Sequence, residues 1–126
     1  MSNLLIIDDD PAACAPLQRL LSQAGHATHC ASGPAQALKF LRERDLDLVL
    51  LDLSMPGSDG FDLLQAIAED RRFAGVPVAV YSGRDDPDSV ARARHLGARD
   101  YLMKGMAWDQ LSQRIDALLS DGSPQT

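Results

Sequence analysis

The sequence lacks any apolar run long enough to cross a membrane. A helix that spans a bilayer needs about 20 consecutive apolar residues, whereas the strongest runs here, Leu4–Ile7 and Leu48–Leu51, are short. No basic residue precedes the first run, so we expect it to be a buried strand and not a signal peptide. These absences lead us to expect a cytoplasmic protein that has no membrane partner.

Cysteine is scarce, and basic residues are outnumbered by acidic ones. Cys14 and Cys30 could pair, but without an export signal we expect two reduced, partly buried thiols. The chain has 12 Lys and Arg residues against 18 Asp and Glu residues, giving a formal net charge of −6. Because binding to a phosphate backbone requires clustered basic residues, nucleic acid is not expected as a direct partner.

What the chain does contain is enough apolar material for one core. Hydrophobic residues make up 45% of the 126 residues, and charged residues 24%, a balance typical of a globular domain. We expect a single domain over residues 1–119. The polar segment that follows, 120–126, is expected to be a flexible tail.

Short apolar runs alternate with segments of helical period along the chain. Strands are expected over 4–7, 27–31, 47–52, 76–81 and 100–103. Helices are expected over 11–24, 34–43, 61–67, 87–97 and 108–118. This strict alternation predicts the α/β class, with a parallel sheet covered by helices on both faces.

Acidic and polar residues follow the predicted strands. The first strand runs into Asp8 and Asp9, the third ends in Asp52, the fourth ends in Ser82 and the fifth runs into Lys104. Open parallel sheets form their sites at the carboxyl ends of the strands, where the strand order reverses. With the order 2-1-3-4-5, Asp8 or Asp9 would face Asp52.

Such a cluster requires positive charge. Two carboxylates ~5 Å apart repel by roughly 3 kcal/mol at an effective dielectric constant of about 20. Mg²⁺, which prefers oxygen ligands, would together with Lys104 bring the formal charges of Asp8, Asp9 and Asp52 to zero. Asp10 is expected to cap the following helix instead.

A site of this kind suits phosphoryl transfer, which depends on positioning and on neutralising charge. A carboxylate can act as the nucleophile and form an aspartyl phosphate. Asp52 is the candidate because it ends the most central strand. Mg²⁺ would hold one phosphoryl oxygen, Lys104 a second, and the Ser82 hydroxyl with nearby backbone N–H groups a third.

Four segments in order resemble the response-regulator receiver family of two-component systems. They are Leu4–Pro11, Leu48–Phe61, Tyr81–Gly83 and Gly97–Lys104. The resemblance covers nearly the whole chain. It implies a flavodoxin-like (βα)5 fold, a three-layer sandwich whose five-stranded parallel sheet has the order 2-1-3-4-5.

The resemblance also implies roles for the acidic residues. Asp52 would accept a phosphoryl group from a sensor histidine kinase or a phosphotransfer protein. Asp9 would bind Mg²⁺ directly, Asp8 largely through water, and Ser54 through its backbone carbonyl, while Lys104 would bind the phosphoryl group. The domain would assist its own phosphorylation and dephosphorylation without acting as an ordinary enzyme.

Two further residues match the family's switch positions, Ser82 and Tyr101. The resemblance implies that phosphorylation pulls the hydroxyl of Ser82 inward and that Tyr101 follows. This would change the face made by the fourth helix, the fifth strand and the fifth helix, where a downstream protein would bind. A homodimer through the fourth and fifth helices stays open.

Two alternatives remain. One is a small phosphatase or phosphotransferase with an aspartyl nucleophile, which is disfavoured because no inserted segment would form a substrate pocket. The other is a receiver used as a phosphorylation-independent adaptor. It stays open because Lys104 is followed by Gly105, where the family usually has a proline, often after a cis peptide bond.

For three other groups of residues, a purely structural role is the simpler interpretation. His26, His29 and Cys30 resemble a metal cluster, but His26 and His29 would face opposite sides of a strand, so packing roles are expected. Trp108 is as compatible with the core as with a partner interface. A basic stretch is expected to be a solvated face, with a docking surface for an acidic partner as the alternative; it comprises Arg84, Arg92, Arg94 and Arg99.

Overall fold

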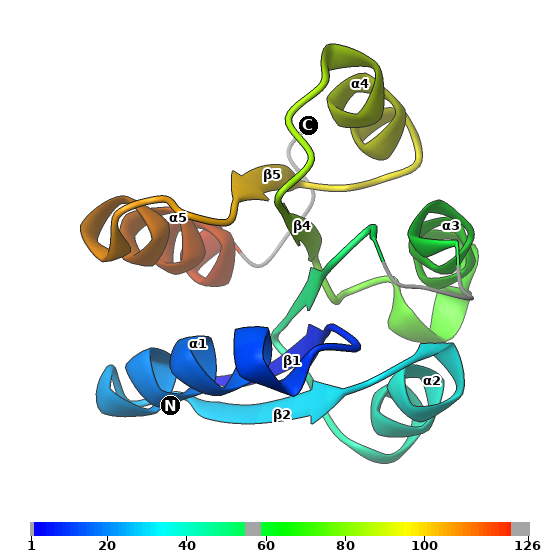
Figure 1. Cartoon of the computed structure of the whole chain (residues 1–126). Coiled ribbons are helices and arrows are strands. Elements are labelled where there is room, and N and C mark those ends of the chain that lie inside the picture. The colour runs from blue at the N-terminus through cyan, green and yellow to red at the C-terminus, as the bar shows by residue number, and fades with distance from the viewer. Residues whose placement is uncertain (1, 55–58, 122–126) are drawn as a thin grey trace.

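The computed structural model describes residues 2–54 and 59–121 (Figure 1). The strands are β1 (Asn3–Ile7), β2 (Ala27–Ala31), β3 (Leu48–Leu51), β4 (Val78–Ser82) and β5 (Asp100–Met103). The helices are α1 (Pro11–Gln23), α2 (Pro34–Glu43), α3 (Gly60–Glu69), α4 (Pro87–His95) and α5 (Trp108–Asp121), with a short 3-10 helix η1 (Arg71–Phe73). The sequence Met55-Pro56-Gly57, which predicts a turn, lies outside the described residues, as does 122–126 of the expected tail.

The five strands form one parallel sheet in the order β2-β1-β3-β4-β5. β1 lies between β2 and β3, and Ile7 at its end pairs with Leu51 at the end of β3. The predicted α/β fold and its strand order are confirmed. The order reverses at β1, so the carboxyl ends of β1 and β3 are where a site is expected.

The helices form two layers, with α1 and α5 on one face of the sheet and α2, α3 and α4 on the other (Figure 1). Leu48 and Leu50 belong to the apolar cluster shared with α1 and α5, whereas Val49 and Leu51 belong to the cluster shared with the other helices. All four side chains are fully buried. A strand covered on both faces must be apolar at every position, which explains the continuous hydrophobic run in β3.

Helix boundaries follow local capping chemistry. Asp10 is the N-cap of α1, as predicted, and its side chain accepts a hydrogen bond of 3.0 Å from the N–H of Ala12. Asp59 and Asp86 cap α3 and α4 in the same way.

β4 begins at Val78, two residues later than the strand expected at 76–81. The 3-10 helix η1 was not predicted.

The longest helices are α5 with 14 residues and α1 with 13. Within residues 2–54 and 59–121, no helix is both long and apolar enough to cross a membrane.

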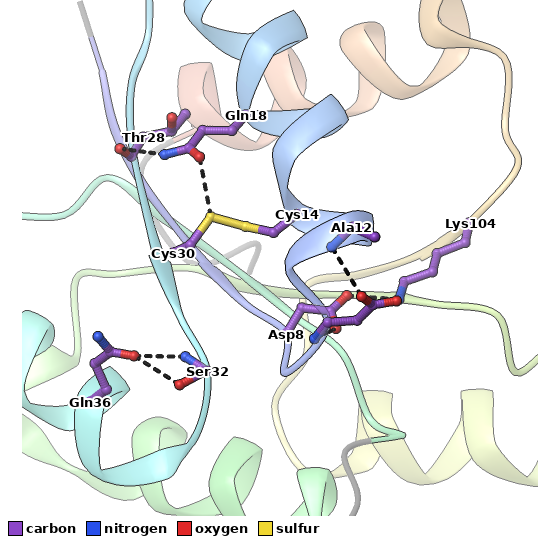
Figure 2. The surroundings of a disulfide bond; sticks show 10 residues. Asp8, Ala12, Cys14, Gln18, Thr28, Cys30, Ser32, Gln36 and Lys104 are labelled. Carbon is purple, nitrogen blue, oxygen red and sulfur yellow. Dashed lines mark hydrogen bonds and ion pairs between the residues drawn. A yellow bond between two sulfur atoms is a disulfide. The ribbon is translucent and has the colours of Figure 1, made fainter.

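Cys14 and Cys30 form a disulfide, so the expectation of two reduced thiols is wrong (Figure 2). Cys14 lies on the buried face of α1 and Cys30 lies in β2, with their Cα atoms 6.8 Å apart. That expectation followed from the cellular compartment alone. The packing of α1 on β2 brings together two residues that are separated by 16 positions.

Candidate functional site

Three carboxylates meet where β1 and β3 end. Asp8 and Asp52 directly follow the paired residues Ile7 and Leu51, and the N–H of Asp52 donates to the carbonyl of Ile7 at 2.9 Å. One carboxylate oxygen from each of Asp8, Asp9 and Asp52 lies within 4.8 Å of the others. The sheet therefore brings these three predicted residues together.

Two of these carboxylates are buried. The side chains of Asp8 and Asp52 are only 4% and 7% exposed, respectively. Each accepts a backbone hydrogen bond of 3.0 Å, Asp8 from the N–H of Asp10 and Asp52 from the N–H of Ser54. Buried negative charges need partners of this kind, because removal from water without compensation is costly.

Lys104 lies across both buried carboxylates. Its ammonium is 2.8 Å from Oδ2 of Asp8 and 3.1 Å from Oδ2 of Asp52. Burial by itself disfavours the ammonium, but the hydrogen bonds to Asp8 and Asp52 outweigh it and raise the pKa of Lys104 above its ordinary value. Lys104 is therefore charged at neutral pH and offsets one of the three negative charges.

The residues fit a small divalent cation. All three side chains offer oxygen, the ligand that Mg²⁺ prefers, and the cluster with Lys104 keeps a formal charge of −2. Ligands bound at about 2.1 Å to one ion are at most about 4.2 Å apart. An oxygen set that already lies within 4.8 Å needs only a small contraction to bind one ion. Ser54, the predicted carbonyl ligand, contacts the same site through its N–H.

Ser82 lies beside Lys104 at the same edge of the sheet. It ends β4, is fully buried, and its carbonyl accepts a hydrogen bond of 2.9 Å from the N–H of Lys104. Its hydroxyl oxygen accepts a hydrogen bond of 3.2 Å from the N–H of Arg84. The Ser82 side chain also forms a hydrogen bond with Tyr101, so the two predicted switch residues are in contact.

Tyr101 is buried in β5, and only 7% of the residue is exposed. Its hydroxyl donates a hydrogen bond of 2.7 Å to the carbonyl of Arg84. Burial raises the pKa of Tyr101 above its ordinary value. Ser82 and Tyr101 are thus both held by the main chain of one residue, Arg84.

The turn after Lys104 explains the missing proline. Gly105 has φ +97°, a backbone conformation that glycine adopts readily and that a proline ring forbids. No cis peptide bond occurs among the described residues. Lys104 nevertheless reaches both carboxylates, so the glycine at this position is compatible with the lysine contacts.

His29 and Cys30, which resembled part of a metal cluster, are engaged in other contacts. His29 stacks on the ring of Phe40 at 5.4 Å between centroids, and burial together with Arg44 lowers the pKa of His29. Cys30 is in the disulfide. In the described part of the chain, the grouping of Asp8, Asp9 and Asp52 is the one acidic, His or Cys cluster that could hold a metal.

Two arginines lie over one aromatic ring, a contact that the sequence did not predict. The guanidinium carbons of Arg84 and Arg92 are 5.5 Å and 4.2 Å from the centre of the Phe61 ring. In the sequence, both arginines are recognisable only as part of the basic stretch. No local pattern connects Phe61 in α3 with Arg84 before α4, so only the packing of the helices reveals the contact.

The fold and the site define a class, a doubly wound α/β domain with a carboxylate cluster at the point where strand order reverses. A family model described as "Response regulator receiver domain" matches residues 4–116. The chain therefore belongs to the response-regulator receiver domain family, a family of signalling domains of two-component systems.

Individual relatives agree with this assignment. Protein PilH of Pseudomonas aeruginosa is 30% identical over 120 residues, which cover 95% of this chain and 99% of PilH. The transcriptional regulatory protein AfsQ1 of Streptomyces coelicolor is 35% identical over 126 residues, but this chain spans only 55% of AfsQ1. The chain thus spans about half of some relatives and nearly all of others.

Solved structures agree as well. A response regulator from Thermotoga maritima is 27% identical, with a TM-score of 0.86 over 95% of this chain and 98% of that one. The signal receiver domain of a DNA binding response regulator from Colwellia psychrerythraea is 29% identical, with a TM-score of 0.87 over 95% of this chain and 99% of that one.

Proposed function

We propose that the chain is a phosphoacceptor receiver in which Asp52 takes a phosphoryl group from a phosphohistidine of a sensor kinase or a phosphotransfer protein. A carboxylate oxygen of Asp52 forms a bond to phosphorus, and the bond between phosphorus and the histidine nitrogen breaks. The observation that carries this proposal is the buried Asp52 carboxylate between the Asp8–Asp9 pair and Lys104.

Each neighbour of Asp52 has a role in this reaction. Asp8, Asp9, Asp52 and the Ser54 carbonyl would hold Mg²⁺. The bound ion would neutralise negative charge at the phosphoryl group. Lys104 pairs with the negative charge that the phosphoryl group brings. The same residues would assist hydrolysis of the aspartyl phosphate, so the domain acts on its own phosphoryl group and on no separate small-molecule substrate.

The output would be a change at the face formed by α4, β5 and α5. Ser82 would donate a hydrogen bond from its hydroxyl to a phosphoryl oxygen, and Tyr101 in the neighbouring strand would follow. This local change in charge shifts the α4–β5–α5 face between two arrangements, and a downstream protein binds one of them. The partners are therefore a phosphodonor protein and a protein target.

The test is to incubate the protein with Mg²⁺ and acetyl phosphate and to measure the intact mass. We expect one phosphoryl adduct, none with Asp52→Asn, and none when a chelator replaces Mg²⁺. Asp116→Asn, an exposed carboxylate on α5, is the matched control and should label as the wild type does.

Two results would redirect the interpretation. Sustained phosphate release from small phosphate esters would favour a phosphatase. If the protein binds neither a phosphoryl group nor beryllium fluoride, the result would favour a phosphorylation-independent adaptor.

A further inference from the structure

We propose that Arg84 is a positioning residue for the switch. Its main chain holds Ser82 and Tyr101, and its side chain connects them, through Phe61, to the backbone of Asp52 and Leu53; these contacts are called the brace below. This inference rests on the proposed function for its consequences. The contacts themselves are observed in the structure and can be tested whether or not Asp52 accepts a phosphoryl group. Arg84 lies in the connection between β4 and α4, two residues after Ser82.

The main chain of Arg84 contacts both switch residues. Its N–H donates to the Ser82 hydroxyl oxygen at 3.2 Å, and its carbonyl accepts from the Tyr101 hydroxyl at 2.7 Å. Any movement of this peptide segment therefore changes both contacts together. The position of the Arg84 backbone thus affects Ser82 and Tyr101 at the same time.

The side chain of Arg84 determines where that segment can lie. Its guanidinium carbon is 5.5 Å from the centre of the Phe61 ring, within the range of a cation–π interaction. Arg92 of α4 lies over the same ring at 4.2 Å. Phe61 thus receives one cation from the β4–α4 connection and one from α4, and it ties both to α3.

The Phe61 ring is itself fixed relative to Asp52. Phe61 is 5% exposed and follows Gly60, the first residue of α3. A Cβ atom at Gly60 would lie 2.5 Å from Cα of Leu53 and 3.0 Å from the carbonyl oxygen of Asp52. The start of α3 therefore packs directly on the backbone of Asp52 and Leu53, which only glycine permits.

These contacts form a continuous connection from Asp52 to Tyr101. It runs from the Asp52–Leu53 backbone to Gly60 and Phe61, across the ring to Arg84, and from Arg84 to the two switch residues. Coupling of this kind requires a physically connected element that has two arrangements. The structure holds the arrangement in which Tyr101 is buried, so the brace favours that arrangement.

The surroundings of the Arg84 side chain fit an ordinary packing role less well than they fit the proposed positioning role. The side chain is 45% exposed, and its other charged contact, Asp86, is 4.0 Å away and 53% exposed. An exposed pair at that distance contributes little to stability. A partly exposed cation–π contact changes a two-state equilibrium about two- to fivefold.

The experiment labels the two tyrosines, Tyr81 and Tyr101, with fluorotyrosine and records ¹⁹F NMR spectra, with Tyr101→Phe assigning the signals. Arg84→Ala should move the Tyr101 signal toward that of an exposed ring, while the Tyr81 signal stays in place. Arg84→Lys keeps the cation and should recover most of the wild-type signal. Phe61→Leu should act in the same direction as Arg84→Ala, and combining the two should add little.

The matched control is Arg72→Ala. Arg72 also lies over a phenylalanine ring, Phe73, at 5.2 Å, but in η1, away from the switch. It should leave the Tyr101 signal unchanged. Thermal unfolding of each variant separates a local change from a loss of the fold.

Phosphorylation provides the second readout. At limiting acetyl phosphate with Mg²⁺, the phosphorylated fraction of Arg84→Ala should fall about two- to fivefold, because phosphorylation and the Tyr101 position bias one another reciprocally. An unchanged Tyr101 signal in a folded Arg84→Ala protein would overturn the brace even if Asp52 is phosphorylated normally. If the signal moves but the wild type takes no phosphoryl group, the proposed function fails and the brace stands.

Discussion

At the scale of single residues, Lys104 determines how much negative charge the site retains. It contacts Asp8 and Asp52 together, at 2.8 Å and 3.1 Å, and it follows the short strand β5. A cation that binds the same carboxylates would add to its effect, because the charge that Lys104 leaves unbalanced is −2. The lysine and the metal are therefore expected to be energetically linked.

Replacement of Lys104 tests that link. Lys104→Gln keeps a hydrogen-bond donor but removes the charge, so the free energy of unfolding in a chelator should fall by about 1–3 kcal/mol. Added Mg²⁺ should stabilise this variant more than the wild type, because the carboxylates it would bind have lost their other cation. Urea denaturation with and without Mg²⁺ measures both effects.

The chain's other lysine, Lys39, is exposed on α2 and provides the control. Lys39→Gln should leave the stability and its Mg²⁺ dependence unchanged. Equal stability of Lys104→Gln and the wild type in chelator would contradict the role given to Lys104.

At the scale of elements, β5 and α5 are tied together by Asp100 and Arg114. The Nε of Arg114 donates to Oδ2 of Asp100 at 2.7 Å, its second nitrogen contacts Oδ1, and Arg94 of α4 lies 3.9 Å from the same carboxylate. Burial alone would raise the pKa of Asp100. The hydrogen bonds from Arg114 and from the N–H of Tyr101 outweigh burial and lower that pKa.

This pairing should make stability depend on pH in the acidic range. A carboxyl group whose pKa is lower in the folded protein stabilises it above the unfolded pKa of about 3.9, and that contribution is lost as the pH falls through the folded pKa. Asp100→Asn should therefore be about 1 kcal/mol less stable than the wild type at pH 7, because Arg114 is partly exposed. Thermal unfolding between pH 3 and pH 7 should show that gap closing below about pH 4. A gap that stays constant over this range would argue against the pairing.

At the scale of the whole molecule, the disulfide links the first helix to an edge strand. Cys14 and Cys30 enclose a loop with a sequence separation of 16. In the chain-entropy model, a bond that closes a loop of this length stabilises the fold by about 3 kcal/mol, mainly by restricting the unfolded chain. This effect acts on the full chain and not on the site itself.

Reduction is the corresponding test. Protein prepared without reductant should contain no titratable thiol and should lose about 2–3 kcal/mol of unfolding free energy when dithiothreitol is added. A Cys14→Ser, Cys30→Ser double variant should be insensitive to dithiothreitol. Two free thiols in the native protein would show that the bond does not form.

Local patterns anticipated much of the molecule. The strands at 27–31 and 100–103 and the helix at 34–43 were predicted with the bounds that the structure has. Their patterns report burial on one or both faces, which is a local property of the sequence. The start of β4 was less well predicted, because Val76 and Pro77 are apolar but the strand begins only at Val78. Pro77 has no N–H and joins the ladder only through its carbonyl, which accepts a hydrogen bond of 3.0 Å from the N–H of Val49.

The amino-acid sequence by itself determined the alternation of strands and helices, the helix caps and the placement of acids directly after buried strands, because each depends on neighbours along the chain. Tertiary structure alone decided that Cys14 meets Cys30, that Lys104 bridges Asp8 and Asp52, and that two arginines share the Phe61 ring. Those contacts join residues far apart in the sequence, and their partners are chosen by how helices pack across the sheet. No local pattern records that geometry.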